Sequence, residues 1–552
     1  MKIEKLLLGL FASFLMVGCS QNDDLPNGGE EAKGKDSYLS IKINSDAIGS
    51  RANDTYIVGD DTENKVNSVL FFFFDAQGNA FNVPVPDAAE YENEIAKIER
   101  TKSKDNYIFV TNIDKSSNGA GASNNIEKIL DAVVVFKVKD NVYPSSVVAV
   151  LNWDYSGNGL SLSSLATQIV NEQKATTSNA FVMSNSVYMK EDFSAVISAQ
   201  SIGTNNFAVS PTEAKKDEKA IKIYVERLAV KVTTTVNNTA TDYKNIGGAH
   251  LFKVVEAPDV DNNSGTEIYA KLINWDINTT AQESNLVKEI KSDWNADSPY
   301  SNWNDAGKFR SYYAVSNSSQ YKTDFVWSTD IKNEFGKADY CLENTDDDNQ
   351  TKVLVKAQLG TVSGETFTPQ TIYQWYSSYY PTVESFKNAI VEHVKSKIII
   401  ESKNITITPL SSSLPTPTAH DVYRVKVSAE GTNYKDANGN DLTSEQIAAI
   451  FAEIPTAKVW SQGATYYFTK ILHHDDAENA KDKYAVIRNH AYSVSIEGVK
   501  GLGTPVYVPE GTEGEEPKIP EPVVPEETET YIAAKINVLS WRLVNNNVVL
   551  GQ

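Results

Sequence analysis

Residues 38–44 read Tyr-Leu-Ser-Ile-Lys-Ile-Asn, a run in which apolar residues alternate with polar ones. Successive side chains of a β-strand point to opposite faces of the sheet, so Leu39, Ile41 and Ile43 are expected to share one face. Nearly the same run returns at residues 531–537 as Tyr-Ile-Ala-Ala-Lys-Ile-Asn, with four of seven positions identical. The chain is therefore predicted to carry two strands of one pattern, far apart in sequence.

Between these two runs, short stretches rich in Val, Ile, Tyr, Phe and Thr are separated by Asn, Asp, Gly and Ser clusters. This spacing is typical of β-sandwiches and barrels. Three short helices are predicted at 162–170, 382–395 and 444–453, the last with Thr443 and Gln446 at capping-box spacing. The chain is expected to be mainly β. The strand-like stretches are 68–74, 107–110, 132–138, 147–151, 221–236, 352–359, 398–407 and 484–496.

The composition bounds the class of protein. The chain has 552 residues, of which 41% are hydrophobic, enough for more than one packed core. It carries 72 Asp and Glu against 51 Lys and Arg, a net charge of −21 that repels phosphate backbones and argues against nucleic acid as a partner. Its two cysteines are Cys19, inside a leader described next, and Cys341, so neither an internal disulfide nor a cysteine zinc site is expected.

Residues 1–19 have the pattern of an export signal. The apolar run 6–17 follows two lysines and is shorter than the ~20 residues that a membrane-spanning helix needs. It ends at Leu-Met-Val-Gly-Cys, where Cys19 can take a lipid; this resembles a bacterial lipobox, with Met16 where Leu is usual. A polar, acidic tether follows. The alternative is a plain signal peptide with a chance cysteine.

The first strand is followed by Ser-Arg-Ala-Asn-Asp at residues 50–54. A basic residue among small and polar ones suits an arginine-specific protease. Cleavage after Arg51 would remove the first strand and make Ala52 the first residue of the mature chain.

Residues 504–530 alternate proline with glutamate and contain one basic residue, Lys518. Proline removes ladder donors and like charges repel, so we expect an extended, semi-rigid linker. The polar stretch 205–219, with Pro211, is a second expected boundary. The expected organisation is a signal peptide at 1–19, a removable tether and strand at 20–51, β-sandwich domains at 52–212 and 213–503, the linker at 504–530 and a donor-strand segment at 531–552.

The repeated pattern suggests strand exchange. Two strands of one pattern can fill one groove, so the last segment of one subunit could replace the removed first strand of another by strand addition. Alternatively, the pattern recurs by chance or the tail completes its own domain. The apolar residues expected to join subunits are Ile532, Ile536, Val538, Leu539, Trp541 and Leu543.

Six further stretches, together with the lipobox and Arg51, resemble one known family in their order along the chain, the Mfa-type fimbrillins of type V pili. The resemblance implies two transthyretin-like β-sandwich domains, lipidation of Cys19, cleavage at Arg51 and polymerisation by donor-strand exchange through residues 531–550. The stretches are 181–188, 225–232, 341–345, 466–468 with His473, 488–492 and 536–542.

The resemblance implies a shaft subunit of a cell-surface fimbrium, supporting adhesion, whose precursor is lipid-anchored at the outer membrane by a fatty acyl group such as palmitate. The proline-spaced tail favours a shaft role over a tip or anchor role. The implied partners are other copies of the chain, tip and anchor subunits, an arginine-specific protease and a host or bacterial surface receptor. No cofactor is implied.

Other constellations point to structure rather than chemistry. Residues 473–476, His-His-Asp-Asp, are expected in a solvated loop because neighbours in a strand face opposite sides. Residues 436–441 begin like a calcium loop but lack its glycine and its final glutamate, so a turn is expected. The aromatic run 373–380 is expected to pack in a core. Its alternative role, stacking on sugars, would make the protein a monomeric glycan-binding surface lipoprotein. No enzyme motif, catalytic residue or metal site is found.

Overall fold

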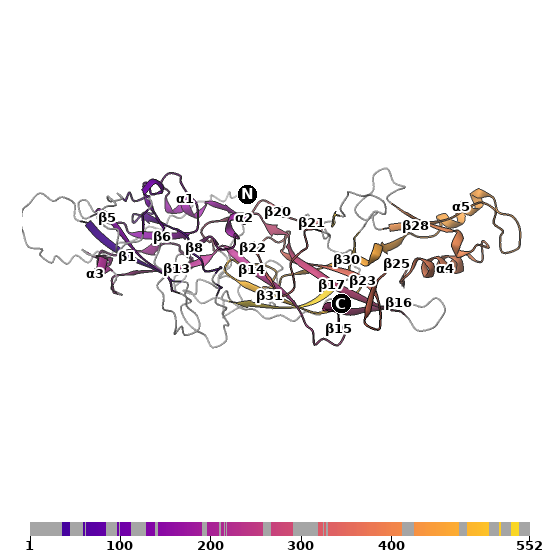
Figure 1. The fold of residues 1–552 in the computed structure, drawn as a ribbon. Helices are drawn as coiled ribbons and strands as arrows, with labels where there is room; N and C mark the ends of the chain where they lie inside the picture. Colours follow the sequence, from indigo (N-terminus) through magenta and orange to yellow (C-terminus); the bar gives the residue numbers. More distant parts are fainter. Residues whose placement is uncertain are drawn as a thin grey trace, which may run out of the picture.

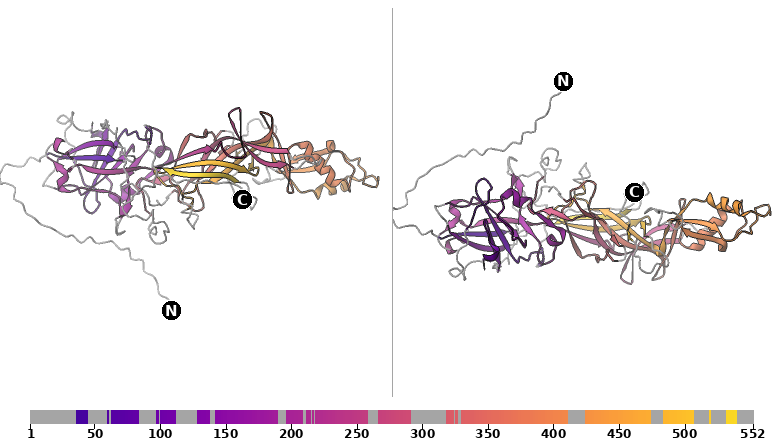
Figure 2. Two further views of the ribbon diagram at one scale, coloured as in Figure 1. Left: turned by 90° about the horizontal axis from the view of Figure 1, so that it is seen from below. Right: turned by 90° about the horizontal axis from the view of Figure 1, so that it is seen from above.

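The protein is elongated, with three packed regions in a row along its long axis (Figures 1 and 2). No helix in the described ranges is both long and apolar enough to cross a membrane. The computed structural model describes residues 36–44, 59–60, 62–83, 97–98, 100–111, 128–137, 142–189, 196–208, 211–214, 216, 218–257, 266–290, 318–323, 325–326, 329–410, 424–473, 483–506, 518–519 and 531–539.

An N-terminal sheet of ten described strands forms the first region, in the order β12-β1-β13-β8-β6-β2-β4-β3, with β5 also on β1 and β11 on β6. Its central strand β2 is buried on both faces, because Phe71 and Phe73 pack into one core while Phe72 and Phe74 pack into another. The strands are β1 Asp36–Asn44, β2 Val69–Phe74, β3 Lys97–Ile98, β4 Tyr107–Thr111, β5 Lys128–Lys137, β6 Ser146–Leu151, β8 Met183–Asn185, β11 Gln200–Ser201, β12 Phe207–Ala208 and β13 Ile221–Arg227.

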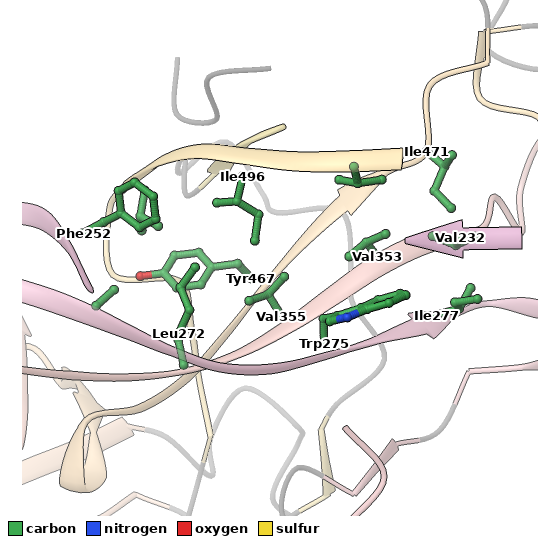
Figure 3. Packing of buried hydrophobic residues seen from close by; sticks show 14 of the residues in the cluster. Val232, Phe252, Leu272, Trp275, Ile277, Val353, Val355, Tyr467, Ile471 and Ile496 are labelled. Carbon is green, nitrogen blue, oxygen red and sulfur yellow. The ribbon is translucent and has the colours of Figure 1, made fainter. Parts of the chain in front are cut away.

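Two sheets form the second region, with the orders β22-β14-β31-β34 and β15-β16-β17-β23-β30-β32, and β24 lies beside β23. Val232 and Ile496 from the first sheet meet Trp275, Val355 and Tyr467 from the second in one buried core (Figure 3). The strands are β14 Ala229–Val236, β15 Tyr243–Ile246, β16 Ala249–Ala257, β17 Thr266–Asn278, β22 Ala338–Leu342, β23 Lys352–Ser363, β24 Thr366–Pro369, β30 Ala464–Lys470, β31 Ala491–Lys500, β32 Thr504–Pro505 and β34 Tyr531–Leu539.

One extended stretch joins these two regions. Strand β13 pairs within the N-terminal sheet, and β14, which follows after the single residue Leu228, pairs within the second region. Residues 221–227 thus lie with the strands before them, although the sequence placed a boundary ahead of them.

The third region, here called the lobe, comprises residues 373–459 and has its own buried core. Its sheet has the order β26-β25-β29-β28-β27 among the described strands. Ile372 pairs with Trp460, and both are buried in the second region's core, so the chain enters and leaves the lobe through adjacent strands. Its elements are β25 Ile372–Trp375, β26 Ser378–Tyr380, α4 Val383–Val394, β27 Ile405–Pro409, β28 Arg424–Ala429, α5 Ser444–Ala452 and β29 Ala457–Trp460.

Short elements complete the described chain. Strand β33, inside the predicted linker, pairs with β21, so the linker contributes two residues to a sheet. The remaining elements are α1 Leu162–Ala166, α2 Glu172–Ala175, α3 Pro211–Ala214, β7 Ile169–Asn171, β9 Tyr188–Met189, β10 Val196–Ile197, β18 Thr280–Ala281, β19 Glu283–Asn285, β20 Tyr321–Lys322, β21 Phe325–Val326, β33 Lys518–Ile519 and the 3-10 turns Arg100–Lys102, Thr204–Asn206, Ser402–Asn404 and Ser461–Gly463.

Candidate functional site

Strand β1, the predicted removable strand, is paired along both of its edges. One edge runs antiparallel to β5, from Asp36 opposite Lys137 to Asn44 opposite Lys128. The other edge meets β12 at Tyr38 and Leu39 and then runs parallel to β13 from Ile41 to Asn44. Removing β1 would therefore expose backbone donors and acceptors on two sides of a slot.

The strands beside this slot carry part of the N-terminal core. Phe207 of β12 and Ile221, Ile223 and Val225 of β13 are buried members of one apolar cluster. Phe207, Ile221 and Ile223 are direct cross-strand neighbours of β1, so the slot opens beside apolar material and a replacement strand with apolar residues would suit it.

Strand β34, the predicted donor, lies in the second region and is paired along one edge. It runs antiparallel to β31, with Leu539 opposite Ala491 and Tyr531 opposite Lys500. The register shifts between Ile496 and Gly498. In the order β22-β14-β31-β34 it is the last strand, so in this single chain the tail completes its own sheet from the edge.

The predicted site residues that the structure describes lie in two different strands. Leu39, Ile41 and Ile43 lie in β1, and Ile532, Ile536, Val538 and Leu539 lie in β34. The structure does not bring the two strands together; each sits in a different region. Cys19, Arg51, Ala52, Trp541 and Leu543 lie outside the described residues.

A buried carboxylate fixes the chain between β1 and β2. Glu63 is fully buried, and its Oε1 lies 2.6 Å from Lys231 Nζ and accepts a hydrogen bond of 2.5 Å from Tyr340 Oη. The Arg227 side chain donates to the Glu63 carbonyl at 3.1 Å. Burial, followed by the hydrogen bond to Glu63, raises the pKa of Tyr340. Glu63 and its partners are far apart in sequence, so no local sequence pattern predicts that they meet.

Four more buried charges lie where the first two regions meet. Lys288 Nζ is 3.0 Å from Glu226 Oε2, and Arg488 is paired with Glu343. Arg488 also donates to the carbonyl of Asn285 at 2.8 Å, in β19, which pairs with β7; Val170 of β7 is buried in the same core as Phe72 and Phe74 of β2. The two regions are thus joined through charge pairs and strand pairing.

The expectation of a solvated loop at 473–476 is wrong for His473, which is 1% exposed and lies 2.8 Å, Nδ1 to Oη, from Tyr492. It lies three residues after the end of β30 and contacts the core residue Tyr492 of β31. His474, Asp475 and Asp476 lie outside the described residues. Within the described ranges, no three potential metal ligands gather.

The other two constellations are turns and packing, as the sequence suggests. The Asp436 carboxylate accepts hydrogen bonds from the backbone N–H groups of Asn438 and Asn440, which is a turn. Tyr373, Trp375 and Tyr380 are buried in the lobe core, and Tyr373 stacks on Phe386 with ring centroids 4.8 Å apart. Tyr376 differs because it is 62% exposed.

Comparison with known proteins gives one family. The model for the C-terminal part of fimbrillin, the major fimbrial subunit protein type IV, matches residues 458–547, which include β30, β31 and β34. No curated protein matches the chain in sequence.

Several solved structures are similar at low identity. A candidate cell adhesion protein from Bacteroides eggerthii is 11% identical at a TM-score of 0.35, covering 94% of this chain and 98% of that one. A fimbrilin from Porphyromonas gingivalis is 13% identical at a TM-score of 0.32, covering 93% and 99%. The tip fimbrial protein Mfa3 from Porphyromonas gingivalis, with a C-terminal truncation, is 11% identical at a TM-score of 0.32, covering 91% and 100%.

The mainly β architecture agrees with the family match, which covers the strands next to the predicted donor. Over residues 458–547, the C-terminal part of this chain is similar to fimbrillin, a family of fimbrial subunits.

Proposed function

We propose that this protein is a fimbrial shaft subunit that polymerises by donor-strand exchange. It is exported as a lipoprotein through Cys19, cleaved after Arg51, and joined to the next copy when β34 of one subunit takes the place of β1 in another. The observation that supports this proposal is the difference in pairing among the described strands: β1 has two paired edges, whereas β34 has one.

The difference in pairing gives the exchange a direction. In the precursor β1 is part of the same chain as its slot, so its effective concentration there is high and an incoming strand competes poorly. After cleavage β1 is held by non-covalent contacts alone. A β34 strand that moves into the slot gives up its pairing with β31 and gains hydrogen bonds along both of its edges. Each added backbone hydrogen bond contributes about 0.5–1.5 kcal/mol.

Burial of the apolar side chains of the tail also favours the exchange. Burying the six large apolar residues of 532–543 contributes roughly 9–18 kcal/mol as an upper bound, before the costs of ordering the tail. The equal pattern of the two runs lets Ile532 and Ile536 take the positions of Leu39 and Ile43 without a change of register. The linker supplies the length that the strand needs to reach another molecule.

The proposal is tested with the mature chain and with a chain that lacks residues 531–552. The mature chain should give a ladder of high-mass species that resists detergent and collapses on boiling. The truncated chain should remain folded, should form no ladder alone, and should stop growth when added to the mature chain because it accepts a strand and offers none. Ladder formation by the truncated chain alone would show that the joining strand lies elsewhere.

A cleavage variant provides the matched control. Arg51→Ala should keep β1 in place and leave subunits monomeric. A second variant with another protease site in place of residues 50–54 should polymerise after that protease is added. Polymerisation of uncut Arg51→Ala subunits would contradict the role of cleavage.

A further inference from the structure

The lobe is not explained by strand exchange. It has a separate core, and none of its strands pairs with β1 or β34 in the described part of the chain. The fimbrillin match begins at residue 458, where the lobe ends. The lobe stands at the end of the molecule opposite the N-terminal sheet (Figures 1 and 2). The lobe, residues 373–459, is therefore free to have a function other than joining subunits.

One residue of the lobe is held in an unfavourable backbone conformation. Trp375 pairs with Ser378, so Tyr376 and Ser377 form a two-residue hairpin loop, and Tyr376 has φ of +52°. The first position of such a loop favours glycine when its φ is positive, because a side chain there crowds the backbone. Tyr376 nevertheless presents a large ring that is 62% exposed. Strained backbone positions cluster at active sites and ligand clamps, so Tyr376 is a candidate for a contact with a ligand.

The ring of Tyr376 belongs to an arranged group. Its centroid lies 4.8 Å from the Trp375 ring and 6.1 Å from the ring of His393, which is exposed at the C-terminal end of α4. Trp375 lies beneath both and is fixed by a hydrogen bond of 3.2 Å from its Nε1 to the carbonyl of Pro455. The exposed pair is therefore supported from below and pre-organised; it is called here the Tyr376–His393 surface.

The charge of the lobe restricts the class of ligand that the Tyr376–His393 surface can bind. Residues 373–459 hold eight basic and nine acidic residues, whereas the whole chain has a net charge of −21. A nearly neutral surface offers no attraction to a polyanion. An aromatic face with a neighbouring hydrogen-bonding ring matches a neutral sugar, whose C–H face lies on the ring while its hydroxyl groups meet polar atoms.

We propose that the lobe is a carbohydrate-binding module in which the Tyr376–His393 surface stacks on a neutral pyranose. Trp375 is its positioning residue. The module is carried on the fibre and acts independently of strand exchange.

The experiment measures binding of the full chain to immobilised neutral oligosaccharides that end in galactose, glucose, mannose or N-acetylglucosamine, beside sialylated and sulfated ones. The wild-type chain should bind at least one neutral probe. Tyr376→Gly and Tyr376→Ala should each lower the affinity about tenfold or more, because the stacking ring is lost. Tyr376→Phe should stay within a few-fold, and Ile399→Ser, which changes another exposed apolar residue of the lobe, should bind like wild type.

Thermal unfolding of the same variants tests the strain. Tyr376→Gly should unfold about 4–8 °C above Tyr376→Ala, because only glycine adopts positive φ at no cost and both variants lack the ring. The proposal is overturned if no neutral probe binds, if binding survives Tyr376→Gly, if Ile399→Ser loses as much affinity, or if the glycine and alanine variants unfold at the same temperature.

Discussion

Arg488 is fully buried and holds two regions together at the scale of single atoms. It pairs with Glu343 and donates to the Leu286 carbonyl at 3.2 Å and to Ser284 Oγ at 2.9 Å. Taking two charges out of water is costly, and the pair is stable only while both partners are present. The pair therefore makes the junction sensitive to single substitutions.

We expect Arg488→Met to lower the free energy of unfolding by roughly 3–5 kcal/mol, because it leaves the Glu343 carboxylate buried without its cation. The double variant Arg488→Met, Glu343→Gln should recover part of this loss. Urea unfolding of the single and double variants gives the interaction energy through a double-mutant cycle. Additive losses would show that the two side chains act separately.

Asp276 makes the stability depend on pH. Burial, with a contribution from the nearby Asp339 carboxylate, raises the pKa of Asp276 to about 7, from an ordinary value of 3.8. Between about pH 4 and pH 7, Asp276 is protonated in the folded state and ionised in the unfolded state. The stability that the protonated carboxyl contributes is complete below the unfolded pKa and is lost as the pH rises through about 7.

Asp276→Asn removes this titration while it keeps the side-chain oxygen that accepts from the Ile277 N–H at 2.9 Å. Relative to wild type, the variant should gain stability as the pH rises from 4 to 8, by roughly 4 kcal/mol at most. Unfolding midpoints of both proteins across this range test the sign. A difference that stays constant with pH would contradict the raised pKa.

Local patterns predicted some residues and not others. The Thr443–Gln446 capping box was predicted, because both partners lie within one helical turn, and it is present in α5. Thr382 likewise caps α4. Glu63 could not be predicted, since its partners Lys231 and Tyr340 meet it only after three distant segments pack together.

At the scale of elements, the alternating faces of β34 allow a matched test of the donor role. Successive residues of a strand point to opposite sides, so Ile536 and Lys535 are expected on different faces. Ile536→Asp should block growth, because a charge would have to enter an apolar slot. Lys535→Asp introduces the same side chain at the neighbouring position, with a change in charge of two units instead of one, and should still assemble. Mass ladders of the two variants are compared; equal ladders would exclude a face-specific fit.

Strand existence was easier to predict than strand grouping. The continuous stretch 221–236 was predicted as β, and it is, yet its first half belongs to one sheet and its second half to another. Alternation reports which faces are apolar but not which neighbours cover them. For the same reason the sequence indicated the helices of the lobe without indicating that they belong to a third core.

At the scale of the whole molecule, the lobe should be separable. Ile372 and Trp460 face each other across adjacent strands, so a short turn can replace residues 374–458 without stretching the chain. The shortened chain should fold and form the same detergent-resistant ladder as the full mature chain. Circular dichroism and thermal unfolding check the fold. A loss of the remaining fold would show that the second region's core depends on the lobe.

The adjacent strands at the base of the lobe also decide what a pull on the fibre would do. Tension between neighbouring subunits, applied at the β1 position and at β34, would run through β13, β14 and β31. Strand β13 pairs with β1 and continues into β14 through Leu228, and β14 pairs with β31, which pairs with β34. The chain leaves for the lobe and returns at the same place, so the lobe lies outside this line of force. The lobe would therefore stay folded while the fibre is under tension.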